Sequence, residues 1–292
     1  MNAIDNIYFV RKLNAPDNPI VHDLIAAITI KAAEHGINII PTLPEDVLEL
    51  RNLKTLVISV GGDGTMLQAM RISSKYSCAC TGFHAGKLGF LNDFSATTNI
   101  DDSIHQLFQL LTDQVIFYSY LENRIPIRVS LLNNVRSTIN PPLSFNEVAI
   151  SRLYSDQILE YDLCIDGEYL GTHRSNSLLI STPTGSTAYS LSAGGSIILP
   201  HAEVLQIVPV APNTLASRPL IIPIRHGHNL VQVDVKPLNI DAAMRIDGMK
   251  IELHEQLTSI TVEAGPVATI LHNPKWSFFN TLATKLGWLK QE

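Results

Sequence analysis

The sequence predicts two domains of different class, an N-terminal α/β domain and a C-terminal β-rich domain. Over about the first 120 residues, apolar strand-like runs alternate with segments of helical periodicity, which is typical of a parallel sheet covered by helices. From about residue 123 to residue 272 the helical signal mostly disappears, and short runs alternate apolar and polar residues. Residues 278–286 then return to a helical pattern after the breaker Asn273-Pro274.

In the N-terminal half, the expected elements follow one another as strand and helix. Short apolar runs predict strands at 7–10, 37–40 and 55–60, and the third is apolar throughout, as a buried parallel strand is. Helical spacing predicts helices at 20–34, 66–74 and 100–111, and a helix start at 44–50. Gly36 ends the first of these helices, and Asp101 and Asp102 favour the first turn of the third.

The C-terminal half is expected to consist of many short strands joined by tight turns. Alternating runs predict strands at 127–132, 159–164, 230–235 and 259–262. The dipeptides Asp166-Gly167 and Asp247-Gly248 lie between strand-like runs and predict hairpins. We therefore expect an α/β domain at 1–122, a β-rich domain at 123–272, and a tail at 273–292 whose helix packs back on the first domain.

Composition and charge exclude several classes of protein. The 292 residues are 46% hydrophobic and 16% charged, which is enough for two cores. Apolar runs such as 207–211 are far shorter than the roughly 20 residues that span a bilayer, and the N-terminus lacks the basic region of a signal peptide. The three cysteines are sparse, odd in number and set in apolar runs, which favours reduced thiols. We expect a cytoplasmic protein with no membrane partner.

The charge distribution also argues against a nucleic-acid partner. The formal net charge is −6, and no Lys/Arg run is longer than two residues. Broad binding to nucleic acid requires a basic surface that displaces counterions. A phosphorylated ligand would therefore have to be bound locally, through backbone N–H groups, a metal ion and a few basic side chains.

A glycine-rich turn lies between the strand at 55–60 and the helix at 66–74. Residues 61–65 are Gly-Gly-Asp-Gly-Thr. Glycines let a ligand approach the main chain closely, and a helix N-terminus offers N–H groups that suit phosphate. The turn is not a Walker A sequence, because no Gly-Lys-Ser/Thr follows, and Leu67 occupies the third glycine position of the dinucleotide fingerprint. Two interpretations remain: a phosphotransfer loop in which Asp63 is a base or metal ligand, and a tight turn in which Asp63 caps the helix.

A second turn is dense in small hydroxylated residues. Residues 181–189 are Ser-Thr-Pro-Thr-Gly-Ser-Thr-Ala-Tyr, and they follow an apolar strand at 178–180. Such a segment supplies hydroxyl and main-chain donors without bulk, which suits close wrapping of a polar ligand. A flexible linker is the alternative, but linkers do not usually follow a buried strand directly. We therefore predict a ligand-binding loop, in which Tyr189 adds a stacking face.

Two further features carry little weight by themselves. Asn146-Glu147 has the groups that bond a base or a ribose, but taken alone the pair is indistinguishable from a surface turn. The histidines, including His226 and His228, show no partner pattern for a metal or a nucleophile, and we interpret them as surface or satisfied core residues.

Taken together, these segments resemble the NAD kinase family. The matching segments are 61–65, 146–147 and 182–189, and the likeness extends to 86–91, 214–220, 279–282 and 284–288. The glycine–aspartate turn is shared with diacylglycerol, sphingosine and phosphofructokinase-type kinases. The hydroxyl-rich loop that ends in Ala188-Tyr189 is much more specific to NAD kinases.

The resemblance implies a reaction and its participants. The terminal phosphate of ATP, with Mg²⁺ or another divalent cation, is transferred to the 2′-hydroxyl of the adenosine ribose of NAD, which gives NADP. NAD and ATP are then the small-molecule substrates, and family members assemble as homodimers or homotetramers. The residues themselves do not distinguish ATP from polyphosphate as donor, or NAD from NADH as acceptor.

The resemblance also implies roles for residues. Asp63 would be the general base, Gly64 would line the phosphate path, and Tyr189 would lie near the adenine. Asn146 and Glu147 would hold the adenosine ribose or base. The implied nucleotide-binding positions are Gly62, Gly64, Thr65, Phe90, Asn146, Glu147, Arg174, Asn176, Thr187, Ala188, Tyr189, Ser190, Leu191, Ser192 and Ala211. No residue is assigned as a dedicated metal ligand.

Three positions depart from the family pattern, and two other functions stay open. Asn176 and Ser177 lie where the family commonly has an aspartate and a glycine, and Met249 lies where some relatives have a glutamine. A lipid- or sphingoid-type kinase would share the glycine–aspartate turn, and it should show an exposed apolar entry or an interfacial helix. A non-catalytic sensor would bind NAD(H) without turnover.

Overall fold

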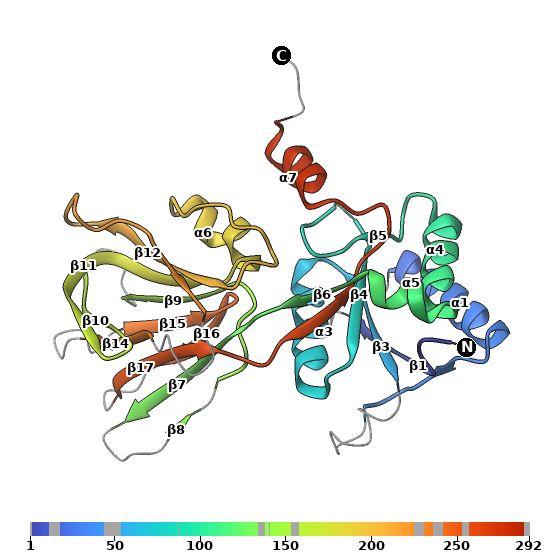
Figure 1. Ribbon diagram of the computed structural model, residues 1–292, viewed down its shortest axis with the longest axis horizontal. Coiled ribbons are helices and arrows are strands. Elements are labelled where there is room, and N and C mark those ends of the chain that lie inside the picture. Colours follow the sequence, from blue (N-terminus) through green and yellow to red (C-terminus); the bar gives the residue numbers. More distant parts are fainter. Residues whose placement is uncertain are drawn as a thin grey trace. The chain divides into compact units, whose positions relative to one another are not determined.

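The chain forms two compact units, one of Met1–Asn123 with Val267–Glu292 (unit 1) and one of Arg124–Pro266 (unit 2) (Figure 1). The computed structural model describes residues 2–11, 18–43, 54–86, 88–133, 138–139, 141–152, 158–224, 231–235, 242–252 and 257–288. The helix start predicted at 44–50 lies outside these residues, as do His226 and His228.

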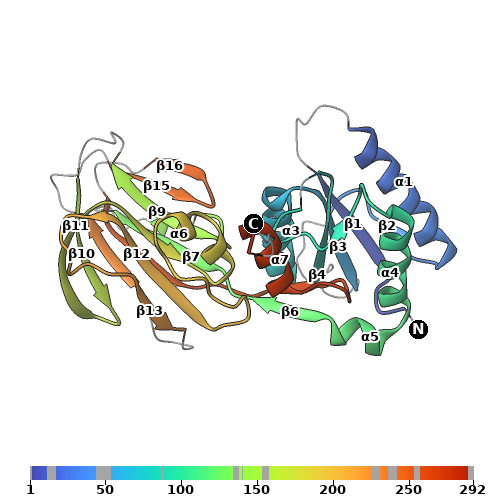
Figure 2. The same ribbon diagram turned by 90° about the horizontal axis from the view of Figure 1, so that it is seen from above.

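Unit 1 is built on a sheet whose strand order is β2-β1-β3-β4-β18-β6, with β5 paired to β4. Its strands are β1 (Asn6–Arg11), β2 (Asn38–Ile39), β3 (Thr55–Gly61), β4 (Ala79–His84), β5 (Phe94–Ser95), β6 (Leu121–Arg124) and β18 (Ala268–Leu271). Strands β1 to β5 and β18 pair in parallel. Its helices are α1 (Pro19–Glu34), α3 (Asp63–Tyr76), α4 (Ile100–Thr112), α5 (Gln114–Ser119) and α7 (Phe278–Leu286) (Figure 2).

Local sequence signals account for these elements. Helix α1 begins with Pro19, and the Asn18 side chain accepts the N–H of Ile20 at 3.1 Å, which satisfies a donor at the helix start. Strand β3 is buried along its length up to Val60, as its unbroken apolar run predicts. Its side chains share one core with α1 and α4, which removes their apolar faces from water.

Helix α3 begins earlier than its apolar pattern indicates. The pattern predicts a helix from Met66, whereas α3 begins at Asp63, with Gly62 as its N-cap. The N–H groups of Thr65 and Met66 donate to the Gly62 carbonyl at 2.9 and 3.2 Å. The glycine-rich segment is therefore a very short turn between β3 and the first residue of α3.

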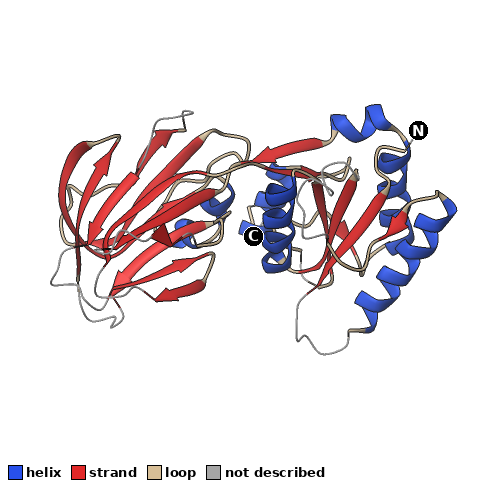
Figure 3. Cartoon of the chain, turned by 90° about the horizontal axis from the view of Figure 1, so that it is seen from below, coloured by secondary structure: helices blue, strands red, loops and turns tan. Residues whose placement is uncertain are grey.

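Unit 2 is an antiparallel β structure. Its strands are β7 (Ile127–Asn133), β8 (Thr138–Ile139), β9 (Glu147–Arg152), β10 (Leu159–Ile165), β11 (Glu168–Ser181), β12 (Val204–Pro212), β13 (Leu220–Pro223), β14 (Val231–Val235), β15 (Ala242–Ile246), β16 (Met249–Glu252) and β17 (Leu257–Ala264). The strand order is β16-β15-β9-β11-β10-β14-β17-β7-β8, and β12 joins β11 to β13. Figure 3 shows that strands dominate this unit, while the longer helices belong to unit 1.

The two Asp-Gly turns predicted in unit 2 are hairpin turns. Asp166 and Gly167 have φ of 51° and 80°, and Asp247 and Gly248 have φ of 47° and 81°. Two consecutive positive φ values give the turn whose twist matches that of paired antiparallel strands. The predicted fold class, α/β followed by β-rich, is confirmed.

The chain returns to unit 1 at Val267. Strand β18 pairs in parallel with β4, so this segment belongs to the sheet of unit 1. The boundary between the units therefore lies between Pro266 and Val267, whereas the sequence placed it after His272. Helix α7 spans Phe278–Leu286, as predicted, and the Ser277 side chain caps its first turn. Among the described residues, no helix is both long and apolar enough to cross a membrane.

Candidate functional site

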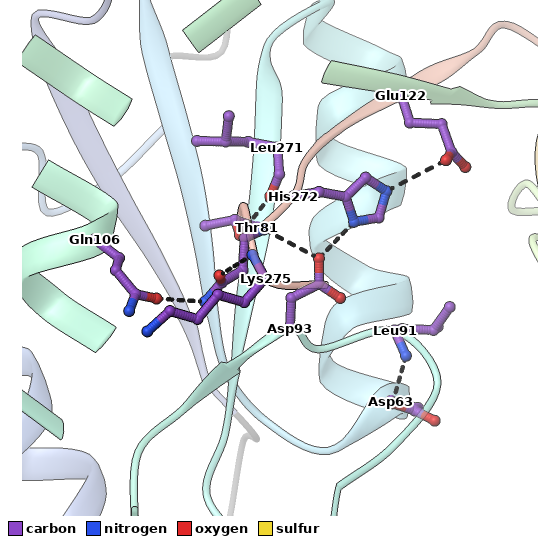
Figure 4. Close-up of polar contacts among 10 residues, drawn as sticks. Asp63, Thr81, Leu91, Asp93, Gln106, Glu122, Leu271, His272 and Lys275 are labelled. Atoms are coloured by element: carbon purple, nitrogen blue, oxygen red, sulfur yellow. Dashed lines mark hydrogen bonds and ion pairs between the residues drawn. The ribbon is translucent and has the colours of Figure 1, made fainter. Parts of the chain in front are cut away.

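The carboxylate of Asp63 is held by the segment 88–93, which we call the 88–93 loop. Oδ2 accepts the N–H of Phe90 at 2.9 Å, and Oδ1 accepts a hydrogen bond from Nδ2 of Asn92 at 3.3 Å. Oδ1 also accepts the N–H of Leu91 at 3.2 Å, the contact drawn in Figure 4. Asp63 therefore does not cap its own helix, because Gly62 is the N-cap and no side chain bonds there. The helix-capping interpretation of Asp63 is wrong.

Two glycines permit this approach. A Cβ on Gly89 would lie 1.9 Å from Oδ1 of Asp63, and a Cβ on Gly82 would lie 2.0 Å from Oδ1 of Asn92. Ser59 in β3 also donates to Oδ1 of Asn92 at 3.0 Å. Because no real Cβ contact is that short, the position of the Asp63 carboxylate depends on glycine at both sites.

The arrangement around Asp63 suits a proton acceptor. An ionised carboxylate has about four lone-pair positions, and the 88–93 loop supplies three donors to them. Asp63 is only partly buried, and the neighbouring Gly62 and Gly64 are exposed. Thr65 is buried and Phe90 is partly buried. A hydroxyl that approaches the turn therefore finds a fixed carboxylate with one position open.

In unit 2, Asp247 fixes the segment that precedes β9. Its Oδ1 accepts the N–H of Asn146 at 2.8 Å and the hydroxyl of Ser144 at 2.7 Å, and its Oδ2 accepts the N–H of Phe145 at 3.0 Å. In return, the N–H of Asp247 donates to the Glu147 carbonyl at 3.1 Å. The β15–β16 hairpin turn thus determines where Asn146 and Glu147 lie.

The hydroxyl-rich loop is bound to the same segment. The Thr182 hydroxyl donates to the Phe145 carbonyl at 2.5 Å and accepts the N–H of Gly185 at 3.0 Å. The Thr182 N–H donates to the Asn146 carbonyl at 2.9 Å. A Cβ on Gly185 would lie 2.0 Å from that carbonyl, so glycine is required there too. The structure thereby brings together two of the segments that carry the family resemblance.

The loop itself is folded into two short helical turns. The first, η1, spans Thr184–Thr187, and the second, α6, spans Tyr189–Ser192. Ser190 is buried, whereas Tyr189 is 45% exposed. Thr187, Ala188 and Leu191 are partly buried, and Ser192 is exposed.

Glu147 is a buried carboxyl whose pKa is raised above its ordinary value. The residue is 7% exposed. Burial, and then the charge of Asp247, raise the pKa of Glu147 to about 7, against the opposing effect of the Tyr189 N–H. Near neutral pH this group therefore exists in both forms, and it is able to accept or donate a hydrogen bond.

The remaining predicted positions lie around β11 and β12. Arg174 is exposed, and its Nε lies 3.3 Å from Oε2 of Glu160. Asn176 is exposed on β11, and Ala211 is exposed on β12 with a left-handed φ of 45°. Ser175 and Ser177 pair with Pro212 and Val210, so the three predicted positions belong to one paired stretch. Exposed ion pairs such as Arg174–Glu160 contribute little to stability.

The predicted residues are divided between the units. Asp63, Gly62, Gly64, Thr65 and Phe90 lie in unit 1, and the other eleven lie in unit 2. The sequence missed the roles of Gly82, Asn92 and Asp247. Asp247 was recognised only as a turn residue, because a turn signal does not reveal which distant backbone a carboxylate will reach.

The described residues contain no group of three or more His, Cys, Asp or Glu side chains that could hold a metal ion. A Mg²⁺ ion carried by a nucleotide does not need such a group, because Mg²⁺ keeps several waters and commonly takes one or two carboxylates beside substrate phosphates. The absence of such a group among the described residues is therefore compatible with a Mg²⁺ ion that is bound mainly by the phosphates of a nucleotide.

Comparison with protein families matches both halves of the chain. Residues 42–114 match the ATP-NAD kinase N-terminal domain, and residues 145–271 match the ATP-NAD kinase C-terminal domain. The NAD kinase of Tolumonas auensis is 34% identical over 250 residues, which cover 84% of this chain and 81% of that protein. The NAD kinase of Thiobacillus denitrificans is 32% identical over 270 residues, which cover 90% and 87%.

Solved structures share the fold. Yeast NADH kinase, solved with NADH, superposes with a TM-score of 0.80 and 22% identity, covering 99% of this chain and 89% of that chain. An NAD kinase from Archaeoglobus fulgidus, solved with ATP, superposes with a TM-score of 0.70 and 21% identity, covering 98% and 100%. At such identities the likeness shows the fold alone.

Proposed function

The chain belongs to the NAD kinase family, and we propose that it transfers the terminal phosphate of ATP to the 2′-hydroxyl of the adenosine ribose of NAD, with Asp63 as general base. The observation that carries the assignment of Asp63 is its geometry. Two backbone N–H groups and one amide fix its carboxylate at the first residue of α3, inside the Gly-Gly-Asp-Gly-Thr turn.

The proposed chemistry needs a proton acceptor at one atom. A ribose hydroxyl is a weak nucleophile until its proton has somewhere to go. The Asp63 carboxylate takes that proton as the hydroxyl oxygen bonds to the γ-phosphorus, and the bond from this phosphorus to the bridging oxygen breaks to release ADP. Because the three donors already hold the carboxylate, little reorganisation is needed during the reaction.

The start of α3 supplies the proposed phosphate site. Helix N-termini present N–H groups and the positive end of the helix dipole to anions. A Cβ built on Gly62 or Gly64 would meet no atom within 4 Å, so the turn has open space beside both glycines. When bound, Mg²⁺ would neutralise charge on the ATP phosphates, and no carboxylate is assigned to hold it, because the open position of Asp63 is needed for the hydroxyl proton.

The NAD site is proposed in unit 2. Asn146 and Glu147 would bond the adenosine ribose, and Tyr189 would offer its exposed ring to the adenine. The fixed bonds from Asp247 and Thr182 to the 145–146 backbone support this assignment, because a binding residue must be held in place. Arg174, Asn176, Ala211 and the loop positions 187–192 complete the proposed lining.

The location and the oligomeric state of the protein are predicted from the sequence alone. A cytoplasmic location and a homodimeric or homotetrameric state stay predictions, and light scattering during gel filtration tests the second. The family assignment gives no support to a lipid kinase or a non-catalytic sensor.

The deciding experiment is an NADP production assay with purified protein, NAD, ATP and Mg²⁺, coupled to an NADP-specific dehydrogenase. Turnover that disappears in Asp63→Asn supports the kinase and its base. NAD binding without turnover, with either ATP or polyphosphate, contradicts the proposal. Replacing NAD by NADH in the same assay determines the acceptor.

A further inference from the structure

His272 lies in a buried polar cluster of unit 1, directly after β18. Its side chain is 8% exposed, its Nδ1 bonds Oδ2 of Asp93, and its Nε2 lies 3.6 Å from Oε2 of Glu122 (Figure 4). The imidazole also stacks on Trp276, with ring centres 3.9 Å apart and planes inclined by 10°. The proposed reaction makes no use of this histidine.

Asp93 connects the cluster to the catalytic carboxylate. It is the last residue of the 88–93 loop, and its side chain is only 3% exposed. The three residues before it are those that donate to Asp63. The loop is thus bound on one side to Asp63 and on the other to His272, whose neighbour Asn273 also donates its N–H to Oδ2 of Asp93 at 3.4 Å.

The returning segment 267–288 holds the loop at its other end as well. Lys285 in α7 donates to the carbonyl of Leu88, and its Nζ lies 5.9 Å from the centre of the Phe90 ring. Lys285 is exposed, whereas His272 and Asp93 are buried. Water competes less for a buried hydrogen bond than for an exposed one, so we take the His272–Asp93 contact as the main anchor of the loop on this side.

We propose that His272 is a positioning residue for the phosphoryl transfer: through Asp93 it holds the 88–93 loop, and through that loop it fixes the carboxylate of Asp63. This inference rests on the proposed role of Asp63 as the base. A displacement of about 1 Å in a catalytic group costs on the order of 10²-fold in rate, so a loosened loop should reduce turnover without changing what binds.

The returning segment has anchors that do not depend on the imidazole. The backbone N–H of His272 donates to the Tyr120 carbonyl at 2.9 Å, and Nδ2 of Asn273 donates to Oε1 of Gln106 at 3.0 Å. Thr81 donates to the Leu271 carbonyl at 2.8 Å. Changes to the His272 side chain should therefore leave β18 in its sheet.

The test compares three variants by kcat, by KM for ATP and NAD, and by melting temperature. His272→Phe keeps a ring for Trp276 but removes the donor to Asp93. His272→Asn places an amide nitrogen close to the position of Nδ1 and restores the donor without the ring. Lys275→Ala is the matched control. Lys275 lies on the same returning segment as His272, and its substitution removes only an exposed ion pair to Asp102, which is outside the 88–93 loop.

We expect kcat to fall about 10-fold or more in His272→Phe, with both KM values within about 3-fold of wild type, and to recover most of the way in His272→Asn. Lys275→Ala should behave as wild type. A folded His272→Phe with wild-type kcat, or equal losses in the Phe and Asn variants, would overturn the proposal, because the donor would then not matter.

Hydrogen exchange of the Phe90 and Leu91 amides separates this inference from the kinase assignment. These amides donate to Asp63, so their protection reports the position of the loop. Exchange should accelerate in His272→Phe and not in His272→Asn. This holds even if the wild-type protein forms no NADP, in which case the proposed function fails but the link from His272 to Asp63 stands. Unchanged protection in His272→Phe would refute that link.

Discussion

The carboxylate of Asp247 accepts the backbone N–H of Asn146 at 2.8 Å, across 101 residues of chain. A single hairpin-turn residue thereby fixes the backbone of Asn146, just before β9, and of Glu147, its first residue, which are the two proposed ribose contacts. Asp63 is held in a comparable way by the 88–93 loop. In both places a charged side chain bonds consecutive backbone N–H groups, and such charge-assisted bonds are stronger than neutral ones.

Replacing Asp247 by Ala should weaken NAD binding. The change removes acceptors for Ser144, Phe145 and Asn146, so the segment before β9 loses its position. We expect KM for NAD to rise about 10-fold, equivalent to roughly 1.4 kcal/mol, with KM for ATP little changed. Asp166→Ala is the matched control, because Asp166 occupies the same place in the other Asp-Gly turn, with φ of 51°. If both variants changed KM for NAD equally, Asp247 would not be what holds the segment before β9 in place.

Replacing Asp63 by Asn should abolish most turnover and leave the fold intact. The amide keeps the shape of the side chain but is a very weak base, so kcat should fall by about 10² or more. Asp101→Asn removes an exposed carboxylate from the first turn of α4 and serves as the control. Wild-type turnover in Asp63→Asn, with an unchanged melting temperature, would exclude the base role.

Replacing Gly89 by Ala should inactivate the protein through Asp63 itself. The new methyl would lie 1.9 Å from Oδ1, so either the carboxylate or the loop must move. We expect kcat to fall by on the order of 10²-fold, as for a displaced catalytic group. Gly86→Ala is the control, because its methyl would meet nothing within 4 Å. If both alanine variants retain activity, the close approach does not determine the base position.

Replacing Glu147 by Gln should stabilise the protein at alkaline pH. Burial, with a contribution from Asp247, raises the pKa of Glu147 from 4.5 to about 7. The folded state therefore binds the proton more tightly than the unfolded chain, so stability is highest below about pH 4.5 and falls as the pH rises to about 7. Above about pH 7 the free energy of unfolding is lower by the full effect of this pKa shift, roughly 3 kcal/mol.

The measurement is the melting temperature of wild type and Glu147→Gln at pH 5 and pH 8. The variant should melt several degrees higher at pH 8, and the difference should shrink at pH 5, where wild-type Glu147 is mostly protonated. Glu168→Gln removes the same charge from an exposed position of unit 2 and controls for net charge. A difference that does not vary with pH would mean that Glu147 titrates normally.

Much of the local structure follows from the sequence. Helical spacing located α1, α4 and α7, and the Asp-Gly dipeptides located two hairpins, because periodicity and turn chemistry act over a few residues. The same spacing placed the start of α3 too late, since Asp63, Gly64 and Thr65 carry no apolar signal. The glycine–aspartate turn and the hydroxyl-rich loop were both recognised as functional candidates.

By itself, then, the sequence determined the class of each half, the two chemical motifs and, through them, the family. Only the tertiary structure decided which distant groups hold those motifs: Asp247 reaches Asn146, Asn92 reaches Asp63, and His272 reaches Asp93. Periodicity tells which face of an element is buried, but not which element covers it. These partners lie far apart along the chain, so they are chosen by the packing of whole sheets, as when β18 joins β4 and brings His272 to the loop.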